Sequence, residues 1–417
     1  MKKLAIIIFA TLLVIAFAMP ASALESIFGG YWRTRAYSQR DFTGNDNEQQ
    51  NVTQVDTRTR LYYTAVLNDN LKFVNKFEFN AVWGDDEGGD IGADGDTFRV
   101  KNSYVDFNVG PVNGKVGIQG TALARGFLFD DDFAGAVISF NGEGFSLPLI
   151  WMRPYENSVA DEDEVDYFGV APSFKPNENF SLTPFILYAY SNDARKWAST
   201  ANFEELNMYY GGVELEAKAG PASIWMTGIY QSGEANLAAN TNQSVDFKAW
   251  LAAAGASVDL GGKADVHGQA FYATGPDEED AANNERSDFF VPKGQSYYWA
   301  EIMGYGTFDN QVSAGSPGDQ IGNIMVGNIG TTIKPMSDLK ISLDAWYAKY
   351  AEEIVMPDGT MEDELGIEAN VTITYTLVEG LDLDLVGAYL FAGDATTMQD
   401  SSDKNPYEIG TRLSLSF

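Results

Sequence analysis

Strict alternation of apolar and polar residues over segments of ten or more residues is the feature that most constrains this sequence. In the last segment, 407–417, an apolar or small residue takes nearly every second position, and the series ends on Phe417. Segments 364–377 and 381–391 alternate in the same way. Because successive side chains of a β-strand point to opposite faces, each segment predicts a strand that is apolar on one face only. Strands of this length with one apolar and one wet face are typical of a membrane-spanning barrel.

Short turns and longer polar segments alternate along the chain. Short turns are expected at Asn68–Asn70, Gly110–Pro111, Asn141–Gly142, Pro176–Asn177, Gly220–Pro221, Gly261–Gly262, Pro335–Met336 and Glu379–Gly380. The longer segments are at about 40–52, 84–96, 121–132, 155–164, 193–205, 234–245, 275–320, 351–362 and 394–405. This order predicts an all-β, antiparallel, up-and-down transmembrane β-barrel of eighteen strands, with sixteen as the alternative and with both chain ends on the short-turn side. Short periplasmic turns and long extracellular loops are the rule for outer-membrane barrels, and a barrel of this size leaves an aqueous channel.

The N-terminus has the pattern of a secretory signal peptide. Lys2 and Lys3 precede an apolar run over 4–18, and Ala21-Ser22-Ala23 gives the small-residue cleavage pattern. We expect removal of residues 1–23 and one barrel domain over 24–417. The apolar run is shorter than the roughly 20 residues of a spanning helix, and no later run is long enough. Since only helices and closed barrels satisfy their backbone groups in lipid, the remaining choices are a barrel or a soluble periplasmic protein.

Composition excludes several classes of protein. The chain has no cysteine, one histidine and a net charge of −32. Disulfides, thiolate sites and cysteine nucleophiles are therefore excluded, and the acidity argues against nucleic acid as a partner. His267 has no second histidine, and no nucleotide-binding or nucleophile-elbow motif occurs, so we predict that the protein is not an enzyme. We expect no cofactor and no dedicated metal site; acidic external loops such as 84–96 would hold Ca²⁺ or Mg²⁺ loosely.

The order of residues along each strand predicts which charged side chains line the channel. A basic track is expected from Arg33, Arg35, Arg58, Arg60, Lys72 and Lys76. An acidic arc is expected from Asp344, Glu364, Glu368, Asp382, Asp384 and Glu408, with Arg412 among them. The first and last strands of a closed barrel adjoin, so the two groups meet along one seam, where Arg33 and Arg35 face Glu408 and Arg412. Opposed charges across a pore orient polar solutes; the alternative is that these charges pair with one another and only keep the channel wet.

One strand is ambiguous, because Arg99 and Lys101 share a face with Val105 and Phe107. A β-bulge or a position beyond the membrane would explain this pattern, and both residues are left out of the predicted track.

Two of the longer segments are candidates for shaping the channel. Segment 121–132 is the third of them, and its Arg125, Asp130, Asp131 and Asp132 would supply mixed charge to a constriction if it folds into the barrel. The alternative is an ordinary exposed loop. Segment 275–320 is acidic at its start, aromatic in its middle and glycine-rich at its end. Loops of this length are usually functional or disordered, and the sequence leaves open whether this one plugs the pore, stacks on sugars or caps the barrel.

Short motifs resemble Gram-negative outer-membrane porins of the alginate-export-like type. They are residues 28–35 (FGGYWRTR), 56–60 (DTRTR), 100–107 (VKNSYVDF), 116–119 (VGIQ) and 365–368 (LGIE). The resemblance implies an eighteen-stranded barrel in the outer membrane whose terminal Phe417 is recognised by the barrel-assembly machinery. Alginate exporters of that type carry a long periplasmic plug loop, whereas every turn expected on that side here is short.

The sequence therefore favours a porin in the outer membrane, in contact with its lipid and lipopolysaccharide, that lets small hydrophilic solutes diffuse through a water-filled channel. One alternative is an export channel for an acidic polysaccharide guided by the arginines. Another is a barrel scaffold or sheath around a periplasmic or surface partner, such as an electron-carrying protein.

Overall fold

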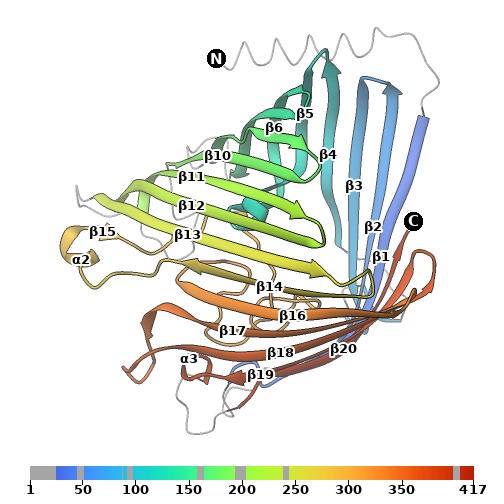
Figure 1. The fold of residues 1–417 in the computed structure, drawn as a ribbon. Coiled ribbons are helices and arrows are strands. Elements are labelled where there is room, and N and C mark those ends of the chain that lie inside the picture. The colour runs from blue at the N-terminus through green and yellow to red at the C-terminus, as the bar shows by residue number, and fades with distance from the viewer. Residues whose placement is uncertain are drawn as a thin grey trace.

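The computed structural model describes residues 25–44, 51–86, 88–91, 97–156, 164–192, 203–237, 244–397 and 404–417, and the expected signal peptide lies outside them. Nearly all regular structure is β-sheet (Figure 1). The strands are β1 (Glu25–Arg40), β2 (Val52–Asn68), β3 (Leu71–Val82), β4 (Thr97–Val109), β5 (Val112–Leu123), β6 (Phe129–Gly142), β7 (Phe145–Tyr155), β8 (Val165–Val170), β9 (Ser173–Asn177), β10 (Phe180–Ser191), β11 (Phe203–Ala219), β12 (Ala222–Leu237), β13 (Ser244–Asp259), β14 (Ala264–Ala273), β15 (Glu285–Arg286), β16 (Ile324–Met336), β17 (Leu339–Val355), β18 (Met361–Val378), β19 (Leu381–Ala392) and β20 (Tyr407–Ser416). The helical turns are η1 (Ala124–Gly126), α2 (Asp280–Asn283) and α3 (Asp394–Thr397). Within the described ranges, no helix is long and apolar enough to span a membrane.

The sheet closes on itself. β1 pairs with β20 from Tyr31 opposite Ser416 to Arg40 opposite Tyr407. The last residue adds two more bonds, since Gly30 N–H donates to Phe417 O at 2.8 Å and Phe417 N–H donates to Gly30 O at 3.2 Å. β8 and β9 both pair with β7 and β10 and together form one wall strand. The wall thus has eighteen antiparallel strands, which confirms the predicted all-β barrel; the two-residue β15 pairs with β13 outside this order.

All eight expected short turns join consecutive wall strands, each within two residues of its predicted place. The β13–β14 turn, for example, runs from Asp259 to Ala264. Both described chain ends belong to this short-turn end of the barrel, as expected, and the C-terminus lies beside β1 (Figure 1).

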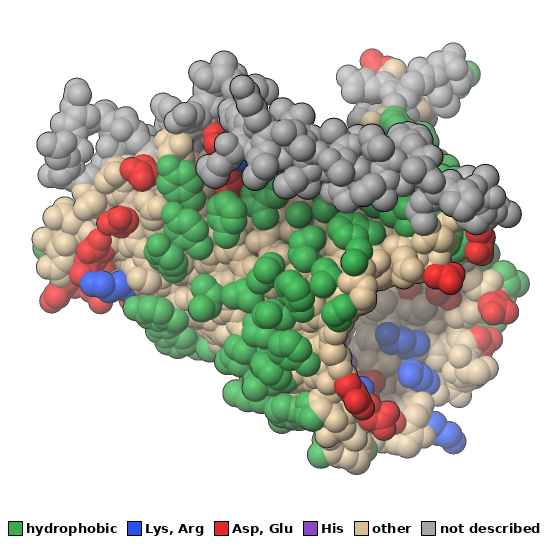
Figure 2. Space-filling model, turned by 90° about the horizontal axis from the view of Figure 1, so that it is seen from above, with side chains coloured by type: hydrophobic (Ala, Val, Ile, Leu, Met, Phe, Trp, Pro, Cys, Tyr) green, Lys and Arg blue, Asp and Glu red, His purple; other side chains and the backbone are tan. Residues whose placement is uncertain are grey.

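The outer surface of the wall is apolar. Along β13, Trp250 and Val258 are 46% and 40% exposed, whereas Phe247 and Leu251, on the other face of the strand, are buried. Phe247 packs edge-on against Phe290, which belongs to the segment between β15 and β16. The buried face is therefore the inner one, and Figure 2 shows the hydrophobic side chains that gather on the outside. A broad apolar outer band is what a lipid environment requires of a barrel.

The connection between β5 and β6 is not a long loop, so the prediction of a long loop over 121–132 was wrong. β5 pairs with β6 as far as Leu123 opposite Phe129, but β4 follows β5 only to Ile118 and β7 follows β6 only from Ala134. Residues 119–133 therefore leave the wall as a two-stranded ribbon, which we call the inner hairpin. Its turn contacts the far side of the barrel, because Phe127 packs on Phe271 of β14.

Residues 287–323, which we call the inner segment, fill much of the barrel. Their contacts reach strands all round the wall: Tyr167 of β8 and Tyr210 of β11 donate hydrogen bonds to Lys293 O and Phe290 O. On the other side, Arg35 of β1 donates to Phe308 O at 2.7 Å. Because backbone groups buried inside a barrel need partners, these wall side chains hold the segment in place.

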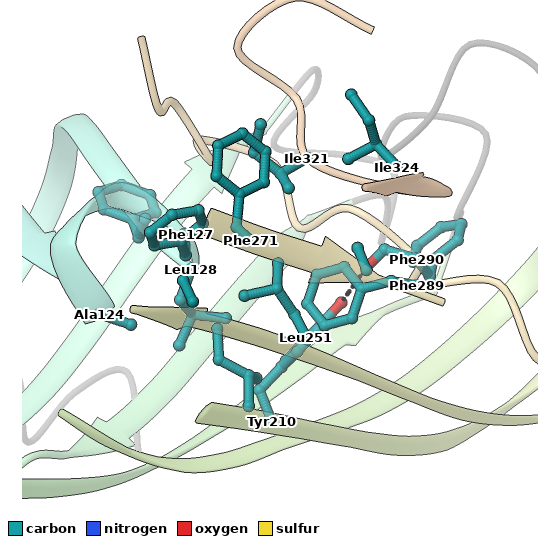
Figure 3. Packing of buried hydrophobic residues seen from close by; sticks show 14 of the residues in the cluster. Ala124, Phe127, Leu128, Tyr210, Leu251, Phe271, Phe289, Phe290, Ile321 and Ile324 are labelled. Carbon is teal, nitrogen blue, oxygen red and sulfur yellow. Dashed lines mark hydrogen bonds between the residues drawn. The ribbon is translucent and has the colours of Figure 1, made fainter. Parts of the chain in front are cut away.

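The hydrophobic core of the molecule lies inside the barrel. Phe289 and Phe290 of the inner segment are buried against wall side chains such as Leu251 (Figure 3). Trp299, Ile302 and Met303 of the same segment are buried in the same cluster. Phe127 of the inner hairpin joins the same cluster, stacked on Tyr297 at 3.9 Å between ring centroids. This packing occupies much of the β6–β18 side. Hollows remain beside the first strands and near the short turns of β11–β17, around His267.

Close approach of the two inward elements requires glycine at one position. Gly126 has φ +92°, and a Cβ there would lie 2.4 Å from the carbonyl oxygen of Ser296. Ser296 N–H also donates to Gly126 O at 3.3 Å. Only glycine tolerates both this conformation and this approach.

Candidate channel lining

The arginines of the predicted basic track lie on β1 and β2 and share one face. Arg33 stands opposite Arg58, and Arg60 stands opposite Glu78 of β3. Paired residues of antiparallel strands project to the same side. That side is the interior, because Asp309 of the inner segment contacts Arg33 and Arg58.

Most of these arginines have partners on the neighbouring strand. Arg35 binds both carboxylate oxygens of Asp56, with Nη2 at 2.8 Å and Nε at 3.0 Å from the nearer oxygens. Arg60 Nε donates to Glu78 at 2.7 Å. Arg58 Nε donates to the side-chain oxygen of Asn80 at 2.8 Å. The pairing fixes the guanidinium groups in rows along the wall rather than leaving them free to fold back.

The two lysines of the track differ in position. Lys76 is half-buried, and its ammonium group lies 5.3 Å from the centre of the Tyr62 ring. No ion pair of Lys76 occurs among the described residues. Lys72 is exposed, close to the short turn that joins β2 and β3.

A β-bulge in β4 adds two cations that the sequence left unassigned. Lys76 pairs with Asn102 and Phe77 pairs with Val100, so Lys101 is an extra residue. Lys101 and Asn102 therefore both face inward, and Lys101 Nζ binds Asp132 of the inner hairpin at 2.7 Å. Beyond the bulge Arg99 pairs with Glu78 and shares its inner face.

Two hollows follow this basic wall. One, of about 350 Å³, is lined among others by Arg35, Arg58, Arg99 and Asp309. The other, of about 360 Å³, is lined by Arg60, Lys76, Lys101, Gly120, Thr121, Asp130, Asp131 and Asp132. Arg58 and Arg60 are two residues apart on β2, so the hollows are successive along the wall. Figure 2 shows one opening of the barrel, with Lys and Arg side chains within it and acidic residues at its rim.

Residues of the predicted acidic arc are mostly engaged in hydrogen bonds. Asp384 pairs with Arg412 at 2.8 Å, and Asp382 accepts from Thr376 at 2.6 Å. Across the β1–β20 seam Arg35 stands directly opposite Arg412, but its carboxylate partner is Asp56. Glu408 stands opposite Gln39 and accepts its side-chain N–H at 3.0 Å. Arg33 and Arg35 thus border the acidic arc without pairing to it.

Glu364 does not share the inner face of Glu368, so the prediction was wrong for this residue. The register between β17 and β18 shifts where Ala348 pairs with Gly366 and Lys349 pairs with Glu364. Leu365 is the extra residue and is buried, while Glu364 is exposed. A bulge moves every residue beyond it to the opposite face.

The charged residues of the inner hairpin separate into two groups. Arg125 pairs with Glu216 of β11 and lies 4.6 Å from the centre of the Trp225 ring, so it belongs to the far wall. Asp132 binds Lys101 and Asn102 of β4. Asp130 and Asp131 line the hollow opposite Arg60. The hairpin thus places carboxylates across this hollow from the basic wall.

Burial shapes the charge of two acids in the inner segment. Burial opposes ionisation of Asp309, but Arg35 and Arg33 outweigh it and hold the pKa of its carboxyl below the ordinary value. Burial raises the pKa of Glu301, against hydrogen bonds from the N–H and hydroxyl of Thr307. The surroundings thus lower the pKa of one carboxyl at the basic wall and raise the pKa of the other in the interior.

His267 lies between two carboxylates. Its Nδ1 is 2.7 Å from Asp265 and its Nε2 is 3.0 Å from Asp344. Ser257 stands opposite His267 in the β13–β14 pairing. Because both ring nitrogens face carboxylates, neither is left to accept a proton from Ser257, and the arrangement lacks the base that a serine nucleophile needs.

Sequence reasoning missed Arg99, Lys101, Glu78 and Asp309 as members of this lining. Regular alternation would place Arg99 and Lys101 on the same face as Val105. This mixed face was the sequence signal of the bulge that turns Arg99 and Lys101 inward. Asp309 carried no signal in strand periodicity, because it lies in the irregular inner segment.

The fold is similar to those of several outer-membrane porins. A BenF-like porin from Pseudomonas fluorescens Pf-5 gives a TM-score of 0.60 at 12% identity, over 94% of this chain and 99% of that one. OpdK from Pseudomonas aeruginosa, solved with vanillate, gives 0.57 at 12% identity over 94% and 99%. OccK11 (OpdR) from the same organism gives 0.58 at 11% identity over 94% and 96%.

No protein-family profile and no curated protein sequence matches the chain. At 11–12% identity these likenesses establish the fold, and the more specific resemblance to alginate-export-like barrels stays a prediction. The chain has the closed, eighteen-stranded fold of Pseudomonas outer-membrane porins.

Proposed function

We propose that this protein is an outer-membrane porin through which small hydrophilic solutes diffuse along the basic wall formed by β1–β4. The observation that carries the proposal is the asymmetry of the interior. Apolar packing occupies much of the side formed by β6–β18, with hollows around His267 near the short turns, whereas charged side chains line successive hollows beside β1–β4. A solute crossing the barrel on the wet side passes Arg58, Arg60 and Lys101 in turn, with Asp131 across the gap.

The lining favours solutes that carry negative charge. Along the hollows, six cations (Arg35, Arg58, Arg60, Lys76, Arg99 and Lys101) face the path. Six carboxylates line the same hollows, and three of them, Asp56, Asp132 and Asp309, are paired with these cations. Rows of basic side chains raise the local concentration of anions and orient them. Vanillate, the carboxylate present in the OpdK structure, has the chemistry that such a wall would accept.

Location and partners belong to the same proposal. The apolar outer surface suits outer-membrane lipid, and acidic residues outside the strands, such as Asp85 and Glu279, suit loosely held Ca²⁺ or Mg²⁺ beside lipopolysaccharide. We infer that residues 1–23 direct export and that Phe417 is read by the barrel-assembly machinery. Its backbone closes the seam, while its side chain is 63% exposed and so free for such recognition.

Conductance of the purified protein in a planar bilayer under a salt gradient tests the proposal. We expect stepwise currents and a reversal potential that shows preference for anions. Lys76→Gln should move the reversal potential toward cations, because Lys76 lines the path. Lys248→Gln is the matched control, since Lys248 projects from the outer face of β13 and pairs with Glu285. Folded protein that never conducts would refute the porin and favour the scaffold or sheath.

A further inference from the structure

One turn of the inner segment, residues 305–311, reaches across to the basic wall; we call it the gate loop. Its Asp309 carboxylate is surrounded by three guanidinium groups. Arg33 Nη2 lies 3.3 Å from Oδ1 and Arg58 Nη1 lies 3.9 Å from Oδ2, while Arg35 Nη1 also contacts Oδ1. A single carboxylate of the loop thus occupies the point where the arginines of β1 and β2 converge.

Two of these arginines also have a carboxylate partner on the wall. Arg35 already has Asp56 as a bidentate partner, and Arg58 lies 3.8 Å from Glu78. Arg33 is only 7% exposed, and its Nε has no hydrogen-bond partner among the described residues. A buried donor without an acceptor is costly, and an anion with oxygens in this position would satisfy it.

The gate loop is held differently from the rest of the inner segment. Trp299, Ile302 and Met303 are buried in the main core, beside β17 and β18. The gate loop instead contacts β1 through Arg35, which donates to Thr307 O and Phe308 O, and through the Phe308 ring stacked on Tyr37 at 4.7 Å. The buried Phe308 and Tyr37 form a small apolar cluster with Val386 that is separate from the main core. Release of the loop from β1 therefore disturbs this cluster and leaves the main core packed.

The gate loop also stands in the solute path. Asp309 and Asn310 form part of the lining of the hollow that contains Arg58 and Arg99. A solute that follows the basic wall meets this turn before it reaches Arg60.

We propose that Asp309 is a displaceable gate: its carboxylate occupies a binding site for an anionic group of the solute, and a solute carboxylate that replaces it releases residues 305–311 and opens the path. This inference rests on the proposed function, because it presumes a solute that travels along the basic wall.

The solute carboxylate and Asp309 compete for the same arginines. A solute carboxylate binds Arg33, Arg35 and Arg58 only when Asp309 has left them, so it stabilises the open state alone. A ligand with this differential affinity shifts the population toward the state it binds. Removal of the Asp309 charge should act in the same sense as the solute, by about tenfold in the open-to-closed ratio. That is the size expected for the loss of one charge-assisted hydrogen bond.

Single-channel recording of the purified protein tests the gate, with propionate as the probe and propionamide as its neutral counterpart. We expect propionate, but not propionamide, to raise the open probability of the wild type. Asp309→Asn should raise the open-to-closed ratio about tenfold without propionate, and propionate should then add little. Asp288→Asn is the control, because Asp288 lies in the same segment but pairs with Arg286. An Asp309→Asn channel that changes only in ion selectivity, or that still responds fully to propionate, overturns the gate.

A cross-linking experiment tests the gate independently of whether the barrel conducts. Asn310 and Gln39 contact each other at 3.4 Å between side-chain atoms, and the chain has no cysteine of its own. In the double variant Gln39→Cys, Asn310→Cys, a short cleavable thiol cross-linker should close the channel until it is cleaved. Propionate should slow formation of the cross-link, a readout that needs no current. Unchanged conductance after cross-linking overturns the gate. If no variant conducts, the porin is refuted, and the cross-linking rate with propionate still decides whether Asp309 is displaced.

Discussion

Replacing Glu368 should release the inner segment from the wall without opening the barrel. Its two carboxylate oxygens accept the N–H groups of Ile302 and Met303, each at 2.9 Å, and the side chain is fully buried. Glu368→Ala leaves two buried donors without acceptors, at about 1–3 kcal/mol each. Glu301 and Glu408 lie near enough to interact electrostatically with Glu368, so its removal also relieves repulsion. We therefore expect the local free energy of unfolding to fall by about 2 kcal/mol, the low end of the range for two such donors.

Hydrogen exchange of the folded protein measures this loss. A loss of about 2 kcal/mol corresponds to roughly 30-fold faster exchange, because each 1.4 kcal/mol is a factor of ten. The change should be confined to peptides that contain Ile302 and Met303, while the paired strands β17 and β18 keep their protection. Glu364→Ala is the control, since Glu364 is an exposed residue on the same strand. Equal exchange at Ile302 in wild type and Glu368→Ala would refute the view that this carboxylate anchors the inner segment.

Two further substitutions probe the same interior. The raised pKa of Glu301 means that its favourable contribution is complete below its ordinary value of 4.5 and is lost as pH rises through the folded value. Glu301→Gln should therefore gain in Tm over the wild type as the pH rises from acid to neutral; a difference that does not vary with pH would contradict this. Phe127→Ala removes a fully buried ring stacked on Tyr297 and should cost about 3–5 kcal/mol locally. Proteolysis within 119–133 should then become faster while the wall stays intact, and an unchanged cleavage rate would show that the hairpin is held by other contacts.

The wall of the barrel was predictable because lipid leaves few choices. Backbone groups in a membrane must be paired, so the strands must close, and period-2 alternation then states which face meets lipid. Turn chemistry such as Gly110-Pro111 and Gly220-Pro221 marked where strands reverse, and these turns lie where expected. Strand number, hairpin order and the position of both chain ends followed from these local signals.

The lining was less predictable, because one extra residue reverses every face beyond it. The bulge at Lys101 brings Arg99 and Lys101 inward, and the bulge at Leu365 turns Glu364 away from Glu368. Both lie in strands whose alternation is otherwise regular. A single sequence reveals a bulge only where regular alternation would place a charged residue on the same face as apolar ones. This was the case for Arg99 and Val105 but not for Glu364.

The apolar interior leaves one trace in the sequence that strand alternation alone does not explain. In β13 the inward residues Ala249, Leu251 and Ala253 are as apolar as the outward Trp250 and Ala252. A strand with water on one face does not need apolar residues on both, whereas a strand covered on both faces does. Lipid accounts for one face only, so the run 249–256 requires an apolar partner inside the barrel. Among the described residues the aromatic middle of 287–323 supplies it. The apolar inner face of β13 therefore predicts where the inner segment packs. The contacts of Asp309 could not be predicted in this way, because they depend on how the folded inner segment lies against β1 and β2.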